Sequence, residues 1–333
     1  MTLEGLSPIT ILLGENSVGK STILESLFLI TGLSNPFMAF SITSLRAHKT
    51  ISMNDVKYMF HDADCQQIPS MAAVVGEEKR QLKLIPTFSI KDSIEVGRMA
   101  QMDNMRQPLT GLKCDFEVNS PVYAYSGTSS IERDKDGNLV PKVDANYKET
   151  VASISLSPYN LGGTFLDDYD ELVKVGRKDV LLKALRLFDS RITAVESTTD
   201  GLFLGYVHLN RLVPISMAGD GVQKYLSIAM QAFRPSTNII LIDEIENGLH
   251  FTAHTKLWEC IFTCASELGK QFFISTHSQE TLRCLAAFLD RFPDKKDLVR
   301  VVTLTREKEI ITPYYLSGDG LSGAMENDVE IRK

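Results

Sequence analysis

The sequence predicts an α/β fold built on a parallel β-sheet with helices on both faces. In the last third of the chain, apolar strand-like runs alternate with segments in which apolar residues recur at helical spacing. Asn238–Asp243, Gln271–Thr276 and Leu298–Leu304 have the composition of strands, and residues 222–233 and 257–268 carry the helical stripe. This alternation is typical of parallel sheets, because crossover helices join their strands and both faces of the sheet are buried.

The first two-thirds of the chain carries shorter and more varied patterns. A strand is predicted at Ile9–Leu13, and a helix over residues 23–30 that ends near Gly32. Lys79, Arg80 and Lys83, in or beside the hairpin predicted around Gly76–Arg80, are interpreted as a solvated face. Further elements are expected from alternating apolar residues, turn dipeptides and apolar stripes. They are a hairpin of Ile68–Val75 and Gln81–Ile90 around Gly76–Arg80, a strand at Leu112–Tyr125, a mobile loop or long hairpin at 126–150 around Asp136 and Gly137, two helices over 169–188 broken at Gly176, and strands over 192–213.

Composition places the chain among soluble globular proteins and excludes several classes of function. The chain has 333 residues, of which 44% are hydrophobic and 23% charged, and these values are ordinary for a globular protein. The formal charge of −7 argues against a globally basic nucleic-acid binder but leaves a local basic groove open. The five cysteines, the lack of a basic leader and the lack of a run of roughly 18 apolar residues predict a reduced, cytoplasmic protein without membrane association.

A phosphate-binding loop is predicted directly after the first strand. Gly14, Gly19, Lys20 and Ser21 have the P-loop spacing, with a strand before and a helix after. The glycines let backbone N–H groups curl around phosphate oxygens, Lys20 offers charge to the β- and γ-phosphates, and Ser21 offers a hydroxyl to Mg²⁺. The residues predicted to bind the nucleotide here are Gly14, Asn16, Ser17, Gly19, Lys20, Ser21 and Thr22.

Two further strands are predicted to end in polar residues suited to nucleotide chemistry. Asp243 and Glu244 follow four aliphatic residues, as in a Walker B element, so Asp243 would hold the Mg²⁺ shell and Glu244 would polarise the attacking water. His277 follows the strand-like run 272–276, and its functional role would be a hydrogen bond to the γ-phosphate and the water. The alternatives are an acidic helix cap for the carboxylates and a structural histidine at a strand end.

A second loop of small residues, 216–221, precedes the helical stripe of residues 222–233. Its candidate residues, Gly219, Asp220 and Gly221, would form another anion cradle at a helix start. One nucleotide does not need two cradles from one chain, so the economical interpretation is a dimer in which this loop closes over the partner's nucleotide. The alternative is a plain turn with a helix cap.

Taken in this order, the motifs resemble the ATP-binding-cassette class of P-loop ATPases. They are most similar to the AAA ATPases of the overcoming-lysogenization-defect type, found in bacterial anti-phage systems. The resemblance runs through Gly-Glu-Asn-Ser-Val-Gly-Lys-Ser, Ala-Gly-Asp-Gly, Ile-Asp-Glu-Ile-Glu-Asn-Gly-Leu-His and Ser-Thr-His-Ser, and reaches the closing Glu330-Ile331-Arg332. It implies a single ABC-type ATPase head over residues 1–333, with an antiparallel β lobe and a helical or irregular insertion over residues 34–205. It also implies Glu246–His250 as the D-loop, and Lys20, Glu244 and His277 as catalytic residues.

Function is expected to be Mg²⁺-dependent ATP hydrolysis by a homodimer or higher oligomer. Eight residues precede the first strand, so the adenine contact that relatives make there is missing or supplied elsewhere, and adenine and guanine both stay open. No Toprim nuclease follows, so the leading interpretation is a stand-alone defence ATPase that senses infection and regulates a separate effector, a nuclease or other toxic enzyme. The alternatives are a RecF-type DNA-repair ATPase that binds nucleic acid, and a nucleotide-gated scaffold with slow turnover.

Overall fold

The computed structural model describes residues 1–47, 53–88, 109–134, 136, 138–157 and 165–333. The described chain divides into two compact units. One unit comprises Met1–Leu24 and Ala152–Lys333, and the other comprises Glu25–Val151. The predicted insertion, residues 34–205, overlaps the second unit but also includes residues 152–205, which group with the first.

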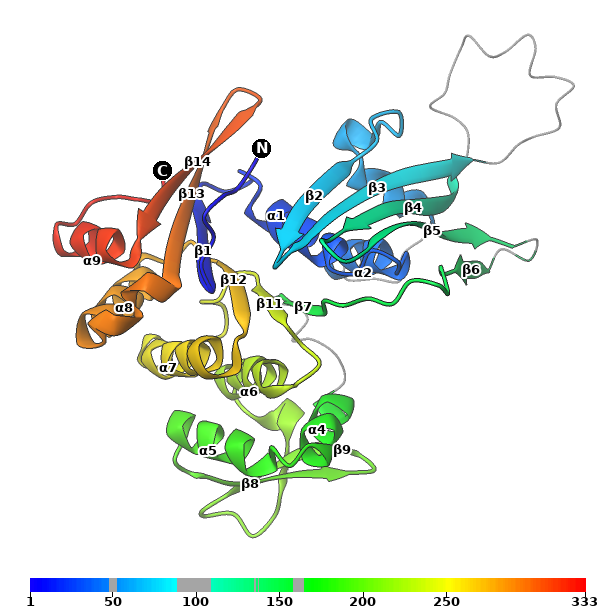
Figure 1. Cartoon of the computed structure of the whole chain (residues 1–333). Coiled ribbons are helices and arrows are strands. Elements are labelled where there is room, and N and C mark those ends of the chain that lie inside the picture. The colour runs from blue at the N-terminus through cyan, green and yellow to red at the C-terminus, as the bar shows by residue number, and fades with distance from the viewer. Residues whose placement is uncertain (48–52, 89–108, 135, 137, 158–164) are drawn as a thin grey trace, which may run out of the picture. The chain divides into compact units, whose positions relative to one another are not determined.

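A six-stranded sheet forms the centre of the first unit, in the order β14-β13-β1-β12-β11-β7 (Figure 1). All its strands are parallel except the edge strand β14, which runs antiparallel to β13. Their bounds are β1 Ile9–Gly14, β7 Ser153–Leu156, β11 Ile239–Ile242, β12 Gln271–Ser275, β13 Val299–Glu307 and β14 Ile310–Ser317. The predicted parallel sheet is confirmed. Because β1, β12 and β11 are neighbours, their carboxyl ends lie side by side.

Helices and a smaller sheet complete the first unit. The predicted break between two helices near Gly176 is confirmed, and this glycine has a φ of +72°. The helices are α4 Phe165–Lys174, α5 Lys178–Phe188, α6 Asp220–Phe233, α7 Phe251–Leu268, α8 Gln279–Arg291 and α9 Gly318–Glu326, with short 3-10 turns at Ile215–Met217 and Pro293–Leu298. The three-stranded sheet consists of β8 Ile192–Thr198, β9 Gly201–Tyr206 and β10 Val213–Pro214.

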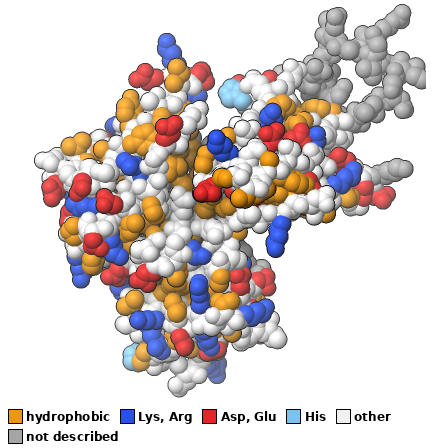
Figure 2. All heavy atoms as spheres, viewed as in Figure 1, with side chains coloured by type: hydrophobic (Ala, Val, Ile, Leu, Met, Phe, Trp, Pro, Cys, Tyr) orange, Lys and Arg blue, Asp and Glu red, His pale blue; other side chains and the backbone are white. Residues whose placement is uncertain are grey.

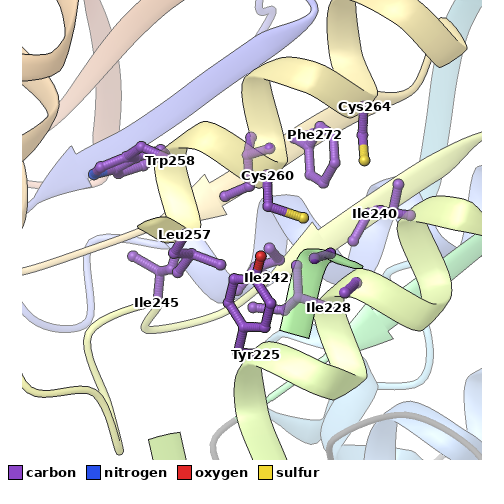
Figure 3. Close-up of a cluster of buried hydrophobic side chains, with 14 of the residues drawn as sticks. Tyr225, Ile228, Ile240, Ile242, Ile245, Leu257, Trp258, Cys260, Cys264 and Phe272 are labelled. Carbon is purple, nitrogen blue, oxygen red and sulfur yellow. The ribbon is translucent and has the colours of Figure 1, made fainter. Parts of the chain in front are cut away.

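The core of the first unit joins α6 and α7 to the central sheet. Figure 3 shows Tyr225 of α6 directed toward Cys260 of α7, with Ile240 of β11 and Phe272 of β12 beside them. Cys260 and Cys264, four residues apart on α7, are both buried among these residues, so this pair packs in the core. Fully burying each large apolar side chain contributes about 1.5–3 kcal/mol, which fixes α6 and α7 against the strands that end in the candidate site.

The second unit is an antiparallel β lobe with short helices. Its strands are β2 Ser70–Val75, β3 Glu78–Phe88, β4 Leu109–Asn119, β5 Ala124–Arg133 and β6 Leu139–Lys142, paired in that order. Helix α1, Lys20–Ile30, begins in the first unit and ends in the second, which also contains α2, Phe37–Ala47, and the 3-10 turns Met53–Met59 and His61–Ala63. The predicted β lobe is confirmed.

Two predicted elements of this lobe need correction. The single strand predicted at Leu112–Tyr125 is two antiparallel strands, β4 and β5, joined by a turn at residues 120–123. The turn between β2 and β3 takes only Gly76 and Glu77, because Val75 already pairs with Glu78. Of the two alternatives predicted for the polar stretch 126–150, a mobile loop or a long hairpin, the hairpin is confirmed, because β5 and β6 pair antiparallel. Strands of an antiparallel sheet bury one face only, and the residues of β5 alternate between exposed and half-buried before Ser129. A polar sequence therefore forms this strand.

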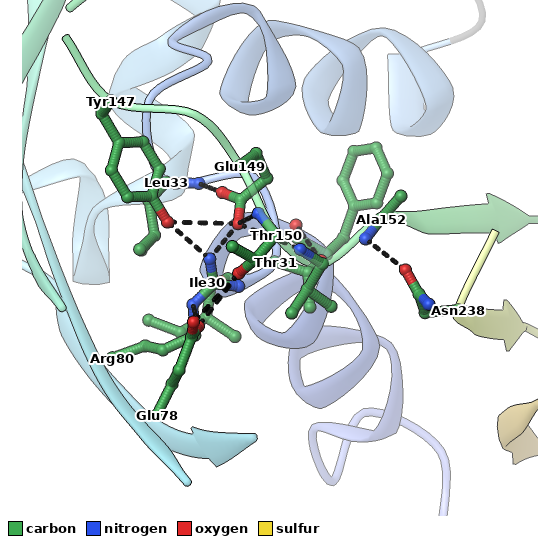
Figure 4. Close-up of polar contacts among 12 residues, drawn as sticks. Ile30, Thr31, Leu33, Glu78, Arg80, Tyr147, Glu149, Thr150, Ala152 and Asn238 are labelled. Carbon is green, nitrogen blue, oxygen red and sulfur yellow. Dashed lines mark hydrogen bonds and ion pairs between the residues drawn. The ribbon is translucent and has the colours of Figure 1, made fainter. Parts of the chain in front are cut away.

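Arg80 is the largest departure from the sequence interpretation in the lobe. Its side chain is fully buried rather than solvated. As Figure 4 shows, it pairs with Glu149, donates to the Tyr147 hydroxyl at 2.8 Å and donates to the Ile30 carbonyl at 3.2 Å. A buried guanidinium needs such partners, because an unpaired buried charge costs several kcal/mol. Arg80 thereby holds the end of α1 to the segment that leads toward β7.

Candidate nucleotide-binding site

The loop between β1 and α1 has the backbone that its glycines allow. Gly14 has a φ of +136°, and a Cβ added there would lie 2.5 Å from the Leu304 carbonyl oxygen. Gly19 has a φ of +111° and Ser17 a φ of +62°. This strand, tight loop and helix arrangement is the one that the P-loop spacing predicts. The amides at the start of α1 can therefore meet an anion, as helix N-termini do.

Lys20 is buried at the start of α1, with 6% of its surface exposed. Its ammonium donates hydrogen bonds to the carbonyl oxygens of Gly14 and Glu15, at 2.8 and 2.9 Å. Burial lowers the pKa of Lys20, and the nearby carboxylates of Asp243, Glu244 and Glu246 act in the opposite direction. The side chain thus folds over the loop that would hold the phosphates.

Ser21 and Asp243 meet although 221 residues separate them in the sequence. The Ser21 hydroxyl donates to Asp243 Oδ2 at 2.8 Å. On the other side, the Ser275 hydroxyl, from β12, donates to Asp243 Oδ1. A hydroxyl and a carboxylate are the hard oxygen donors that Mg²⁺ prefers, so the two predicted metal ligands fit this ion. Ser275 was not predicted, because its position at the end of an apolar strand gives no signal of a partner.

The residues that follow β11, 243–248, form an acidic turn. Glu244 has a φ of +49°, and left-handed backbone at a residue other than glycine costs about 1–3 kcal/mol and is enriched at functional sites. Its N–H donates to the Ser275 hydroxyl at 2.9 Å, and its Oε2 accepts from Asn247 Nδ2 at 2.5 Å. These contacts hold the Glu244 carboxylate beside Asp243.

Lys224 of α6 lies beneath the acidic turn, and the sequence did not single it out. Its ammonium donates to the carbonyl oxygens of Glu244 and Asn247, both at 2.8 Å. Only 5% of the residue is exposed, and burial lowers its pKa to about 8 despite the nearby carboxylates of the turn. The one feature of the sequence that could have indicated Lys224 is its position as a single lysine within the apolar helical segment 222–233. Lys224 connects the helix after the 216–221 loop to the backbone of the acidic turn.

This lowered pKa predicts a pH dependence of stability. The unfolded chain holds the Lys224 proton more tightly than the folded chain, so the free energy of unfolding should rise with pH between about 8 and 10.5. From pH 7.5 to pH 9, wild type should gain about 1 kcal/mol relative to Lys224→Met, which lacks the titrating group. Urea unfolding of both proteins at the two pH values measures this. Parallel responses of the two proteins to pH would contradict it.

His277 follows β12 and is half-buried at the same end of the sheet as Gly14 and Asp243. Its main-chain N–H donates to Glu246 Oε1 at 2.8 Å, and its main-chain carbonyl oxygen accepts from Arg332 Nη1 at 2.9 Å. The three strands β1, β11 and β12 therefore bring their predicted site residues to one edge. The catalytic roles of Lys20, Glu244 and His277 stay predictions.

The 216–221 loop ends in an open helix start. Gly219 is the N-cap of α6 and makes no side-chain capping bond, and both Gly219 and Asp220 are exposed. A Cβ added at Gly221 would lie 3.3 Å from the Gly248 carbonyl oxygen, so this loop adjoins the acidic turn. The candidate nucleotide contacts Asn16 and Thr22 are likewise exposed, beside the start of α1.

Comparisons with known proteins bear on the class of protein to which this fold belongs. A family model described as "AAA domain, putative AbiEii toxin, Type IV TA system" matches residues 131–283, a range that contains the acidic turn and His277. The chain is also similar to an "ATP/GTP phosphatase" of Helicobacter pylori, with 24% identity over 98% of this chain and 94% of the relative. Both matches agree with the predicted α/β P-loop fold and with the prediction of an ATP-hydrolysing enzyme.

Solved structures of SMC heads are similar over most of their length. The SMC head domain from Thermotoga maritima has 11% identity and a TM-score of 0.42, with 95% of this chain and 94% of that chain covered. An SmcHead bound to the C-winged helix domain of ScpA has 12% identity and a TM-score of 0.46, with 94% of this chain and 92% of that chain covered.

Among the described residues, no helix is long and apolar enough to cross a bilayer.

Proposed function

We propose that this chain is a Mg²⁺-dependent ATPase whose nucleotide site is completed by a second copy of the chain. The hydrogen bond between Ser21 and Asp243 carries the proposal, because it joins the P-loop to the strand that ends in the acidic turn. When bound there, Mg²⁺ supplies charge neutralisation to the β- and γ-phosphates. Ser21 and Asp243 would hold the ion.

The chain's own residues would position the phosphates and the water. The amides of the P-loop bind phosphate oxygens, and Lys20 turns from the carbonyls of Gly14 and Glu15 toward the added negative charge. Glu244, held by Asn247, orients the attacking water. His277 donates a hydrogen bond to the γ-phosphate. Phosphoryl transfer needs little more than such positioning and charge stabilisation.

The open start of α6 supports the proposed dimer. Its first-turn amides have no side-chain cap, and Met217 in the preceding loop is 77% exposed. An uncapped helix start attracts phosphate, and an exposed methionine beside it would be buried by a second protein surface. The 216–221 loop of one copy would thus close over the nucleotide of the other.

Mixing two inactive variants tests the shared site. Lys20→Ala removes the P-loop charge, and Gly221→Arg fills the helix start with a bulky side chain. Neither variant alone should hydrolyse ATP, but a mixture should recover activity, because one site of each heterodimer keeps both a working P-loop and a working loop. Phosphate release across mixing ratios measures this. A mixture no more active than either parent would contradict the dimer.

We further propose that a separate effector, a nuclease or other toxic enzyme, is regulated by this ATPase in an anti-phage system. The description of the matching family calls the AAA domain itself a putative toxin of a TA system, which supports action beside a second protein but does not make that protein the toxic one. ATP binding can only bias a conformational equilibrium, and the effector would read that change. An ATPase that acts directly on DNA is the alternative, and on the one face that Figure 2 shows, Lys and Arg side chains lie among Asp and Glu rather than in a uniformly basic patch.

The effector is tested by expressing a tagged copy of the chain with its neighbouring open reading frames and identifying the proteins that co-elute. Glu244→Gln, held in the ATP state, should change the amount or activity of a co-eluting protein, and Lys20→Ala should block that response. If nothing co-elutes in any nucleotide state and DNA stimulates hydrolysis, the repair-type alternative replaces the effector model. Tight ATP binding without steady turnover would instead favour a nucleotide-gated scaffold.

A further inference from the structure

We infer that Arg332 and Glu246 clamp the backbone of His277 from two sides and so position this histidine for ATP hydrolysis; the inference rests on the proposed function. Glu246 accepts from the His277 N–H at 2.8 Å, and Arg332 donates to the His277 carbonyl oxygen at 2.9 Å. Both polar groups of the residue's backbone are therefore bound by charged side chains. Such charge-assisted hydrogen bonds are about twice as strong as neutral ones.

Arg332 is itself oriented by Glu330. The two side chains form paired contacts, Nε to Oε1 at 2.8 Å and Nη2 to Oε2 at 2.6 Å, which leave Nη1 for His277. The same contacts lower the pKa of Glu330 to about 2, so its carboxylate is charged at any working pH. The segment is anchored to the sheet because Thr303 of β13 donates to the Ile331 carbonyl at 2.7 Å. Arg332 thus reaches His277 from a fixed position.

Glu246 connects the clamp to the acidic turn. It lies two residues after Glu244, and Lys224 holds the carbonyls on either side of it, those of Glu244 and Asn247. The second oxygen of Glu246, Oε2, is buried and has no hydrogen-bond partner within the described ranges of the chain. The residue that orients the water and the residue that contacts the γ-phosphate are therefore held by one turn.

This arrangement makes Arg332 a positioning residue rather than a catalytic one. With its main-chain N–H and C=O both bound, the backbone of His277 has little freedom to rotate, so its Cα–Cβ bond keeps one direction at the end of β12. Displacing a catalytic group by about 1 Å can cost roughly 100-fold in rate. Loss of the clamp should therefore slow hydrolysis without weakening ATP binding.

Steady-state hydrolysis by Arg332→Ala tests the clamp. We expect kcat to fall by roughly 10- to 100-fold, with ATP affinity and thermal stability close to wild type. Arg332→Lys, which keeps one charged donor, should recover part of the rate. Arg283→Ala is the matched control, because it breaks an exposed ion pair with the nearby Asp328 and leaves His277 untouched. This control should hydrolyse ATP like wild type.

A double-mutant cycle separates positioning from general destabilisation. In the His277→Ala background, Arg332→Ala should cause no further loss of kcat, because it acts through the missing side chain. A wild-type rate in Arg332→Ala, or a loss that adds in full to that of His277→Ala, would overturn the clamp and leave the proposed function standing. Absence of hydrolysis in wild type itself would overturn the proposed function and the clamp with it.

Discussion

Replacing Lys20 with alanine is expected to abolish ATP binding. The ammonium makes the charge-assisted contacts of the P-loop, each worth about 1.5–3 kcal/mol, so the affinity should fall by at least about 100-fold. The fold should persist, because Lys20 lies at the start of α1. Loss of its ammonium leaves two carbonyl oxygens without this partner, and one of them belongs to Glu15, an exposed residue. Titration with a fluorescent ATP analogue measures the affinity.

Lys174→Ala is the matched control for this variant, because it removes an exposed lysine from the end of α4. It should bind the analogue as wild type does. If Lys20→Ala also binds like wild type, the assignment of residues 14–21 as a P-loop fails. If the unfolding transition of Lys20→Ala shifts strongly, Lys20→Arg is the second variant. It keeps a positive charge at the position but lacks the compact ammonium, so it separates loss of the fold from loss of the ammonium.

Replacing Glu244 with glutamine is expected to keep ATP binding but slow hydrolysis by ~10²–10⁴. That loss corresponds to about 3–5 kcal/mol of activation free energy. Glutamine has nearly the shape of glutamate, and its amide oxygen can still accept from Asn247, so the acidic turn should keep its conformation. The variant should accumulate as an ATP-bound dimer, visible by size-exclusion chromatography and by single-turnover hydrolysis.

Glu280→Gln is the corresponding control, since it neutralises an exposed carboxylate in the first turn of α8. Its turnover should equal that of wild type. Wild-type turnover in Glu244→Gln would exclude Glu244 as the residue that orients the water. A monomeric, ATP-bound Glu244→Gln would leave that role intact and contradict the dimer.

Local patterns were enough to find the parts of the site that the chain builds from consecutive residues. The P-loop depends on glycines whose φ values only they adopt easily, and the acidic turn follows a strand whose four residues are all buried. Both features are visible within about ten residues, and their chemistry follows from residue type. The parallel sheet was equally accessible, because apolar strands alternate with helical stripes along the last third of the chain.

Partners that are distant in the sequence were not accessible in this way. β7 is four residues long, and although Ser153–Leu156 alternates polar and apolar residues as strands do, nothing in these residues indicates that the strand pairs with β11. Arg80 looked solvated among charged neighbours, yet Glu149 and Tyr147 arrive from another segment and bury it. Lys224 and Ser275 gained their importance only when packing set them against the acidic turn.

The sequence by itself determined the fold class, the P-loop and the carboxylates, because hydrophobic period and glycine conformation are local properties. The tertiary structure decided which side chains hold those residues in place. Ser21 meets Asp243 only because β1 and β11 both pair with β12. His277 is bound by Glu246 and Arg332 only because the acidic turn and the segment 330–332 reach the same strand end. Such contacts depend on the order of strands in the sheet, and no short stretch of sequence encodes that order.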